Sequence, residues 1–381
     1  MAVFSSDNGA RRTVLKGVRR LVVKVGSNLL REAPGERTAQ LIAQLLEVRR
    51  RGIEVILVTS GAIPLGMTIL GWHRRPRELA RVQGLSALGQ GYLMRYYENA
   101  CEAHGAHCAQ LLLTAADLRD RERNVRVADC LRALLEEDIL PIVNENDSVC
   151  VEEIKIGDND TLAAMVATMM GAQLTVLMTT VDAFHAVEKD GSFGERFSVV
   201  TALDKGLLSM AGATDGNPYS TGGMMTKLHA ASICTAGGYA MAILDGRDFG
   251  TLSRFLDGED IGTLFCQTVS RKTMGSWQRF LAFFSEPVGA LVVDDGAREA
   301  LLRENRSLLP GGVLGVSGVF RKGEPVRILD ARRQEIGRGI ANFSSEDLLR
   351  ICGEKSARLP ELLGHPVESP EAVHKDYLVL N

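Results

Sequence analysis

The sequence contains no apolar run long enough to cross a membrane, and no apolar signal core follows its basic N-terminus. We therefore expect a cytoplasmic protein without membrane association. The formal net charge is only -3, so the chain as a whole has no attraction to nucleic acid. Repeats and low-complexity tracts are absent, and 381 residues with 45% hydrophobic content are enough for two globular domains.

The seven cysteines are scattered, odd in number and free of any CxxC spacing, which fits a reducing compartment. One segment, CEAHGAHC, places Cys101, His104, His107 and Cys108 close together and could be drawn as a zinc site. The alternative is the end of a surface helix that Gly105 interrupts before the next strand. We favour the helix end, because structural zinc sites use more regular ligand spacing.

Two common phosphate-binding signatures are missing as well. No GxxxxGK[ST] occurs, which excludes a P-loop NTPase, and no HRD and DFG pair occurs, which excludes a protein kinase.

Short apolar runs alternate with helical patterns up to about residue 265. This alternation predicts an α/β fold with a mostly parallel sheet covered by helices on both faces, a three-layer α/β/α sandwich. The expected strands are 20–26, 54–60, 140–146, 174–180 and 239–246, and the expected helices are 38–52, 85–100, 124–137, 161–172 and 224–238. In such folds ligands bind at the carboxyl ends of the strands.

The pattern changes past about residue 280. One helical stretch is followed there by several short strands separated by Gly-containing turns, which predicts a small β-barrel-like domain. We therefore expect domains at residues 1–270 and 280–381.

A lysine lies inside the first strand. Burying the charge of Lys24 in a central parallel strand is unfavourable unless the lysine has an ion-pair partner or binds a ligand, although an edge strand would tolerate it. Gly26 favours ligand binding, because a glycine there lets a ligand approach the backbone.

Two further segments offer room and donors to a ligand. Small residues, Thr59 to Ala62, end the second strand. Thr221, Gly222 and Gly223 open a helix that carries Lys227, and free N–H groups at a helix start bind anions. Each signal alone is weak, since a flexible glycine turn explains the second equally well.

Short acids and amides gather between the apolar run 139–143 and the helical stretch 161–172. A metal cage, a solvated loop and a substrate cradle all fit the composition. No ligand spacing demands a metal site of protein ligands, and Asp158 or Asp160 could serve only as a helix N-cap. Together with two lysines and two small-residue turns, the loop favours phosphoryl transfer, which needs positioning and positive charge.

These segments together resemble the glutamate 5-kinases of the amino-acid kinase family. The similarity covers nearly the whole chain: VVKVGSNLL, VTSGAIPLG, LLLTAADLRDRER, PIVNENDSV, EIKIGDNDTLAA, TGGMMTKLHAA and GTLF. NEND followed by IKIGDND is the most specific pair. The last hundred residues resemble a PUA domain through VDDGA, SLLPGGV and GVFRKGEPVRI.

The resemblance implies ATP-dependent phosphorylation of the γ-carboxylate of L-glutamate, the first step of proline biosynthesis, with Mg²⁺ accompanying ATP. It implies catalytic roles for Lys24, Asp158, Asp160 and Lys227. It places glutamate against Ser60, Asn144, Asp147 and Asn159. It places the nucleotide against Lys24, Thr179, Thr180, Thr221, Gly222, Gly223, Met224, Met225, Thr226 and Lys227.

The resemblance also implies a homo-oligomer, a dimer or tetramer, with proline as feedback inhibitor and glutamate-5-semialdehyde dehydrogenase as a candidate partner. PUA domains bind RNA in other proteins. Acids dilute the basic residues of this one, so we favour an architectural or regulatory role. Those basic residues are Arg321, Lys322, Arg327, Arg332, Arg333 and Arg338.

The chain departs from the family pattern beside the expected nucleotide site. TDVDGLY is replaced by TTVDAFH, which changes Thr180, Ala183 and His185. VRVA replaces LNAR at 125–128, Ser220 replaces a common Gly, and ILDGR replaces a strand ending in NG. Two alternatives therefore stay open: a nucleotide- or RNA-binding regulator with reduced catalysis, and another small carboxylate or amino-acid kinase.

Overall fold

The computed structural model describes residues 4–5, 8–150, 158–187, 192–203, 223–267, 278, 280–304 and 306–380. Its contacts divide the chain into two compact units. The first contains Met1–Leu118 and Glu122–Thr273, and the second contains Arg119–Arg121 and Met274–Asn381. Most of the boundary expected between residues 270 and 280 lies outside the described residues.

A nine-stranded sheet forms the centre of the first unit, as far as the described residues show. Every pairing from β10 through β6, β2, β3 and β5 to β4 is parallel. The strands, in spatial order, are β1 (Phe4–Ser5), β9 (Val199–Val200), β11 (Thr263–Phe265), β10 (Ala240–Asp245), β6 (Leu174–Thr179), β2 (Arg20–Val25), β3 (Glu54–Val58), β5 (Leu140–Glu145) and β4 (Cys108–Leu113).

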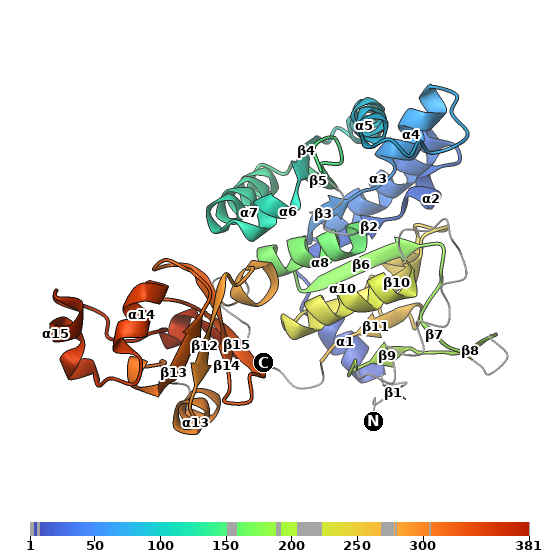
Figure 1. Cartoon of the computed structure of the whole chain (residues 1–381). Coiled ribbons are helices and arrows are strands. Elements are labelled where there is room, and N and C mark those ends of the chain that lie inside the picture. The colour runs from blue at the N-terminus through green and yellow to red at the C-terminus, as the bar shows by residue number, and fades with distance from the viewer. Residues whose placement is uncertain are drawn as a thin grey trace. The chain divides into compact units, whose positions relative to one another are not determined.

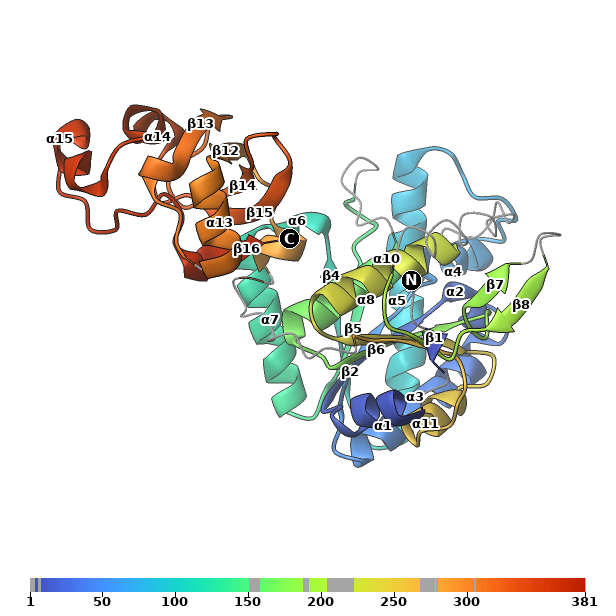
Figure 2. The ribbon, with the colours of Figure 1, turned by 90° about the horizontal axis from the view of Figure 1, so that it is seen from below.

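Helices cover both faces of this sheet. Helices α1, α3 and α11 lie on one face, while α8 and α10 lie on the other (Figure 1, Figure 2). The helices are α1 (Asn8–Lys16), α2 (Ser27–Leu30), α3 (Pro34–Arg50), α4 (Ala62–Ile69), α5 (Leu79–Glu102), α6 (Ala115–Arg119), α7 (Arg121–Glu136), α8 (Asn159–Met170), α10 (Met224–Ala236) and α11 (Thr251–Leu256). The expected three-layer α/β fold is confirmed.

Strand β2 shows how the sheet positions a charge. Leu21, Val23 and Val25 belong to the core shared with α3, α5 and α11. Because side chains alternate along a strand, Val22 and Lys24 point to the opposite face, toward α8. Strand β2 lies between β3 and β6, so Lys24 is on a central strand, and the edge-strand alternative is wrong.

Two features were not visible in the apolar pattern. Strands β1 and β11 run antiparallel to their neighbours β9 and β10 at one side of the sheet. A two-stranded hairpin, β7 (His185–Val187) with β8 (Phe193–Arg196), follows β6. These strands have two to four residues each, too few to establish a period.

The second unit is a separate β-rich body with its own core around Leu291, Val326 and Ile328. Its five-stranded sheet has one parallel pair, β12 with β14, and is otherwise antiparallel. The strands, in spatial order, are β13 (Val313–Ser317), β12 (Gly289–Val293), β14 (Pro325–Leu329), β15 (Glu335–Ile340) and β16 (Leu378–Leu380). Its helical segments are η2 (Phe280–Phe284), α13 (Asp295–Glu304), η3 (Pro310–Gly312), α14 (Ser345–Ile351), η4 (Ser356–Arg358), α15 (Leu359–Leu363) and η5 (Lys375–Tyr377).

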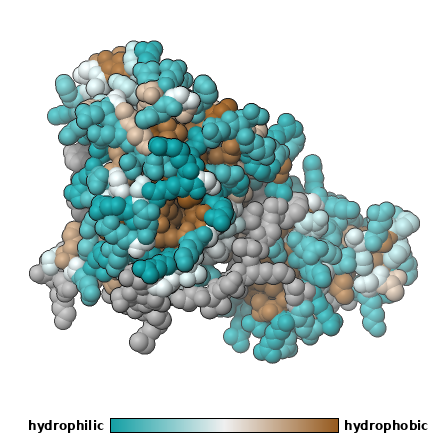
Figure 3. Space-filling view, turned by 180° about the vertical axis from the view of Figure 1, so that it is seen from behind, coloured by the Kyte–Doolittle hydropathy of each residue, from teal (hydrophilic) through white to brown (hydrophobic). Residues whose placement is uncertain are grey.

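Among the described residues, no helix combines the length and the apolar character that a membrane span requires. The face shown in Figure 3 is mostly hydrophilic, with hydrophobic residues gathered in small areas.

Candidate active site

A cavity of about 1350 Å³ lies in the first unit, at the carboxyl ends of the parallel strands. Lys24 on β2, Ser60 after β3, Asn144 on β5 and Thr179 on β6 all line it. This is the edge of the sheet at which α/β folds bind ligands.

Asp160 joins the two expected lysines. Its Oδ1 lies 2.6 Å from Lys24 Nζ, and its Oδ2 lies 2.9 Å from Lys227 Nζ. The carboxylate is only 1% exposed, while Lys24 and Lys227 are 12% and 5% exposed. The first turns of α8 and α10 and the end of β2 thus bring three charges together, with a local charge of plus one.

The ionisation of Asp160 follows from these neighbours. Burial alone would raise the pKa of Asp160, but the charges of Lys24 and Lys227 outweigh burial and hold that pKa below its usual value. Asp160 therefore stays ionised and orients both ammonium groups.

Asp158 has a different position. Its Oδ1 accepts hydrogen bonds from the backbone N–H groups of Asp160 and Thr161, at 2.7 and 2.8 Å, so it caps α8. Burial and the charge of Asp160 raise the pKa of Asp158, against the effect of those N–H bonds. It also lines the cavity, but it touches neither lysine through any hydrogen bond or ion pair between described residues.

Asn159 connects the ends of two strands, β3 and β5. Its Nδ2 lies 2.7 Å from the Thr59 carbonyl, 2.8 Å from Ser60 Oγ and 2.9 Å from Asn144 Oδ1. Asn144 in turn donates to Gln90 Oε1 at 3.0 Å. The Asn159 Oδ1 is buried and receives no hydrogen bond from the described residues. An unsatisfied acceptor at a cavity is a place for a ligand donor.

Helix α5 supports this network from behind. Tyr97 Oη lies 2.6 Å from Thr59 Oγ1 in a fully buried contact. A Cβ at Gly89 would lie 1.8 Å from the Ala62 carbonyl oxygen, and one at Gly66 would lie 2.1 Å from the Leu85 carbonyl oxygen. The two glycines therefore let α4 and α5 approach closely, which fixes the start of α4 at the cavity.

Sequence reasoning missed these supporting residues. Gln90 and Tyr97 lie within an ordinary helical pattern, and nothing in that pattern separates them from core or surface positions. The paired glycines at 66 and 89 are the one signal that could have indicated close helix packing.

Ser60 and Asp147 are the other two residues that the resemblance places against glutamate, the phosphoryl acceptor; we call this part of the cavity the acceptor side. Both line the cavity, as does the buried Glu145, which sequence reasoning did not single out. Ser60 and Asn159 are in direct contact, and Asp147 approaches the same cavity from the segment that follows β5.

Five of the predicted nucleotide-side residues line the same cavity besides Lys24: Thr179, Thr180, Gly223, Met224 and Lys227. Met225 and Thr226 do not line it, and the Thr226 hydroxyl lies 2.8 Å from the Gly223 carbonyl oxygen and 3.5 Å from Asp160 Oδ2. Thr221 and Gly222 lie outside the described residues. Gly223 is the N-cap of helix α10, and no side chain among the described residues caps the helix, so its first N–H groups can donate to a ligand.

Of the three changed residues in TTVDAFH, two lie away from the cavity. Ala183 is fully buried, and the His185 ring contacts Asp182 Oδ1 at 3.1 Å and the Gly194 carbonyl at 3.2 Å. Neither residue lines the cavity, whereas Thr180 does.

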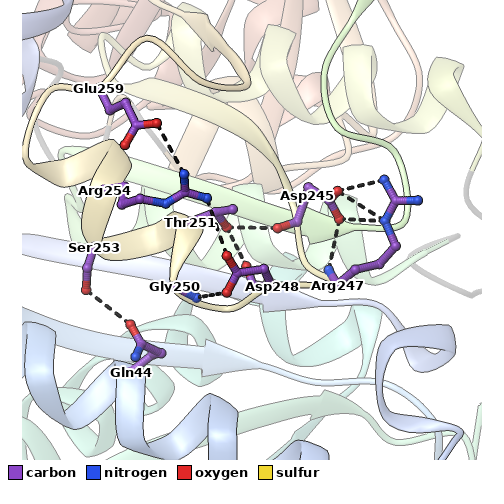
Figure 4. Close-up of polar contacts among 9 residues, drawn as sticks. All are labelled: Gln44, Asp245, Arg247, Asp248, Gly250, Thr251, Ser253, Arg254 and Glu259. Carbon is purple, nitrogen blue, oxygen red and sulfur yellow. Dashed lines mark hydrogen bonds and ion pairs between the residues drawn. The ribbon is translucent and has the colours of Figure 1, made fainter.

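The acid in ILDGR is neutralised locally. Arg247 contacts both carboxylate oxygens of Asp245, at 2.9 and 2.6 Å (Figure 4). These hydrogen bonds lower the pKa of Asp245. Asp245 on β10 is the neighbour of Thr179 on β6, which lines the cavity. The Arg247 guanidinium therefore balances a negative charge next to the residues expected to contact the nucleotide.

A basic group at the cavity was also missed. Arg31, His73, Arg74 and Arg75 line it, and the three arginines form no ion pair with any described residue. They lie between predicted elements, where a charge run usually indicates only a solvated loop.

The zinc interpretation of CEAHGAHC gains no support. No group of three or more metal-ligating side chains forms among the described residues, and these include all four members of the motif. The segment is the end of α5 and the start of β4, as favoured from the sequence.

The family models agree with this description. The Amino acid kinase family model matches residues 19–245, and the PUA domain model matches residues 289–363. The first match covers the strands and helices that surround the cavity.

Relatives extend the similarity to nearly the full chain. Glutamate 5-kinase of Methylococcus capsulatus is 40% identical over 378 residues, which is 97% of this chain and 99% of the relative. Glutamate 5-kinase of Pelobacter propionicus is 36% identical over 377 residues, which is 97% of this chain and 100% of the relative.

A solved structure shares the fold. N-acetylglutamate synthase from Neisseria gonorrhoeae has a TM-score of 0.50 and 18% identity, covering 68% of this chain and 62% of that one. The family match, the relatives and the shared fold lead to one conclusion: the chain belongs to the amino acid kinase family, among the glutamate 5-kinases, and carries a PUA domain.

Proposed function

We propose that this protein transfers the γ-phosphoryl group of ATP to the γ-carboxylate of L-glutamate, forming L-glutamyl 5-phosphate for proline biosynthesis. The observation that carries the proposal is the buried Asp160 carboxylate holding Lys24 and Lys227 at one cavity. The relatives named above are glutamate 5-kinases over their full length.

The reaction asks for charge stabilisation rather than acid–base chemistry. A carboxylate acceptor is already ionised near neutral pH, so no general base is needed. The acceptor oxygen attacks the γ-phosphorus and ADP leaves with the bond electrons. Negative charge on the equatorial oxygens is then stabilised by two lysines that Asp160 has oriented in advance.

The acceptor side would hold glutamate by complementary groups. The Asn159 Oδ1, which lacks a donor among the described residues, can accept from the substrate ammonium. Ser60 and the backbone N–H groups at the start of α4 can donate to a carboxylate. Asn144 would act through Asn159, whose Nδ2 it fixes at 2.9 Å.

The nucleotide would occupy the side of the cavity formed by Thr179, Thr180, Gly223 and Met224. The start of α10 offers uncapped N–H groups to a phosphate. Lys24 and Lys227 lie between this side and the acceptor side.

Mg²⁺ would enter as MgATP, held mainly by phosphate oxygens and water. Both oxygens of Asp160 already face lysines, and Asp158 Oδ1 accepts two backbone N–H groups. Asp158 and Asp160 both line the cavity, but these contacts leave them little free acceptor capacity for a metal. The metal supplies charge neutralisation on the phosphates.

The test traps the acyl phosphate. Purified protein with glutamate, MgATP and hydroxylamine should form γ-glutamyl hydroxamate, and aspartate or N-acetylglutamate in place of glutamate should give little product. Repeating the assay with GTP measures the effect of Thr180 on nucleotide choice. Absence of product with both nucleotides, from protein that binds ATP, would favour the regulator alternative.

The remaining expectations are proposals of the same kind. Proline should compete with glutamate, because it resembles the cyclised product, and non-competitive inhibition would contradict an overlapping site. The homo-oligomer and the contact with glutamate-5-semialdehyde dehydrogenase rest on the family resemblance, and the cytoplasmic location rests on the basic N-terminus without an apolar core and on the scattered cysteines.

A further inference from the structure

The segment CEAHGAHC has no part in the proposed reaction, yet the fold brings its two cysteines together. Cys101 lies in the last turn of α5, and Cys108 is the first residue of β4. The connecting turn is closed by hydrogen bonds from the N–H groups of His104 and Ala106 to the Cys101 carbonyl, at 2.9 and 3.0 Å. Gly105 adopts φ +65° within it, which suits glycine.

The two thiols share one environment. Cys101 is buried and Cys108 packs against the same core while keeping partial exposure to solvent. One hydrogen-bonded turn joins the two residues, and each side chain acts on the pKa of the other. Both are free thiols in this structure, and no other cysteine is adjacent to either of them in sequence.

This interaction polarises the pair. The Cys108 side chain lowers the pKa of Cys101, burial acts in the opposite direction, and the nearby Arg49 guanidinium lowers it further. The Cys101 side chain in turn raises the pKa of Cys108. Loss of one proton therefore leaves a thiolate facing a thiol, the arrangement from which disulfides form.

We propose that Cys101 and Cys108 are a redox modification site, at which a peroxide converts the pair into a reversible intrachain disulfide. One sulfur attacks the peroxide, the O–O bond breaks, and a sulfenic acid and one water result. The second sulfur then displaces the hydroxyl group, which leaves as a second water. In total two thiols and one hydrogen peroxide give one disulfide and two waters.

The disulfide would fasten the end of α5 to the start of β4. Helix α5 also carries Gln90 and Tyr97, which support Asn144 and Thr59 on the acceptor side. The pair itself lies at the amino end of β4, whereas the cavity lies at the carboxyl ends of the strands. The modification therefore acts on the helix that supports the site without entering the cavity.

Peptide mapping tests this directly in the full-length folded protein. Trypsin cleaves after Arg95 and Arg119, so one peptide, residues 96–119, contains both cysteines. The protein is treated with hydrogen peroxide, then denatured in the presence of N-ethylmaleimide so that buried thiols are also labelled, and digested. We expect peptide 96–119 to carry no N-ethylmaleimide label and to weigh two hydrogen atoms less than the reduced, unlabelled peptide. After reduction with dithiothreitol and renewed labelling, it should carry two labels.

Variants supply matched controls. Cys130 is exposed on α7, so Cys130→Ser should leave the disulfide intact, whereas Cys101→Ser and Cys108→Ser should each abolish it. If either serine variant fails to fold, the peptide map of the wild-type protein is sufficient to decide the proposal. The proposal is overturned if peptide 96–119 keeps both labels at a peroxide concentration that oxidises Cys130. It is equally overturned if Cys101 or Cys108 pairs with a different cysteine.

Discussion

The acceptor side and the nucleotide side of the cavity are built differently. On the acceptor side, Asn159 has three polar partners within 2.9 Å, and Asn144 has a buried partner on α5. On the nucleotide side, the side chains of Thr179 and Thr180 form no hydrogen bond with any described residue, and the backbone at the start of α10 is the main donor. Asp160 and its lysines lie between the two sides.

The difference indicates where specificity is fixed before any substrate binds. A connected amide network holds its geometry and rejects a misplaced acceptor, because each displaced amide loses a buried hydrogen bond. Backbone donors bind phosphate with little dependence on side-chain identity. Substitutions should therefore cost most at the junction, less on the acceptor side and least on the nucleotide side.

Replacing the junction carboxylate should have the largest effect. Asp160→Asn leaves two buried lysines without their counter-charge, and we expect a loss of about 3–5 kcal/mol in the free energy of unfolding. Urea denaturation measures it. Asp158→Asn is the matched control, because asparagine also caps a helix, and should cost less than about 1 kcal/mol. Equal losses of stability in the two variants would contradict the role of Asp160 as the counter-charge of Lys24 and Lys227.

The pH dependence of that difference has a definite sign. The folded-state pKa of Asp160 is lowered from 3.8, so its stabilising contribution is present above 3.8 and is lost as pH falls through the folded pKa. The difference between wild type and Asp160→Asn should thus stay constant between about pH 5 and 8 and shrink only below 3.8.

The next effect is expected on the acceptor side. Asn159→Ala removes the amide that joins Thr59, Ser60 and Asn144, and we expect kcat/KM for glutamate to fall about 10- to 100-fold. The KM for ATP should change less than about two-fold. Asn124→Ala, which removes a buried amide on α7, should alter stability but neither KM. Equal changes in both substrates would contradict the division of the cavity.

A smaller effect is expected behind the network. Tyr97→Phe removes the 2.6 Å hydrogen bond to Thr59 Oγ1 while the ring stays packed, and should lower kcat/KM for glutamate about two- to ten-fold. A double-mutant cycle with Thr59→Val isolates the coupling. Strictly additive effects would show that Tyr97 does not act through Thr59.

The smallest effect is expected on the nucleotide side. Thr180→Ala removes one side chain from the proposed nucleotide side but leaves the backbone donors at the start of α10, so the KM for ATP should stay within about two-fold. Steady-state kinetics at saturating glutamate measures it. A change above about ten-fold would mean that the Thr180 side chain, and not the backbone of α10, dominates nucleotide binding.

The sequence predicted the strands and helices around the cavity because each is long enough to show a period. The lysine inside an apolar strand indicated that Lys24 has a partner or a function, and the family resemblance implied catalytic roles for Asp160 and Lys227, which the structure brings into contact with each other. It could not reveal Gln90 and Tyr97, because a buried hydrogen bond leaves no pattern along the chain. The short antiparallel strands β1 and β11 escaped for the same reason, their pairing being set by tertiary contacts.

The central claim is that Asp160 holds two lysines for phosphoryl transfer, and turnover of Lys227→Ala tests it most directly. Hydroxamate formation at saturating glutamate and ATP should fall by about 100- to 1000-fold or more, while Lys24 still pairs with Asp160 and the cooperative unfolding transition persists. Lys16→Ala, an exposed lysine on α1, should keep the wild-type rate. A Lys227→Ala rate within about ten-fold of wild type would remove Lys227 from the mechanism.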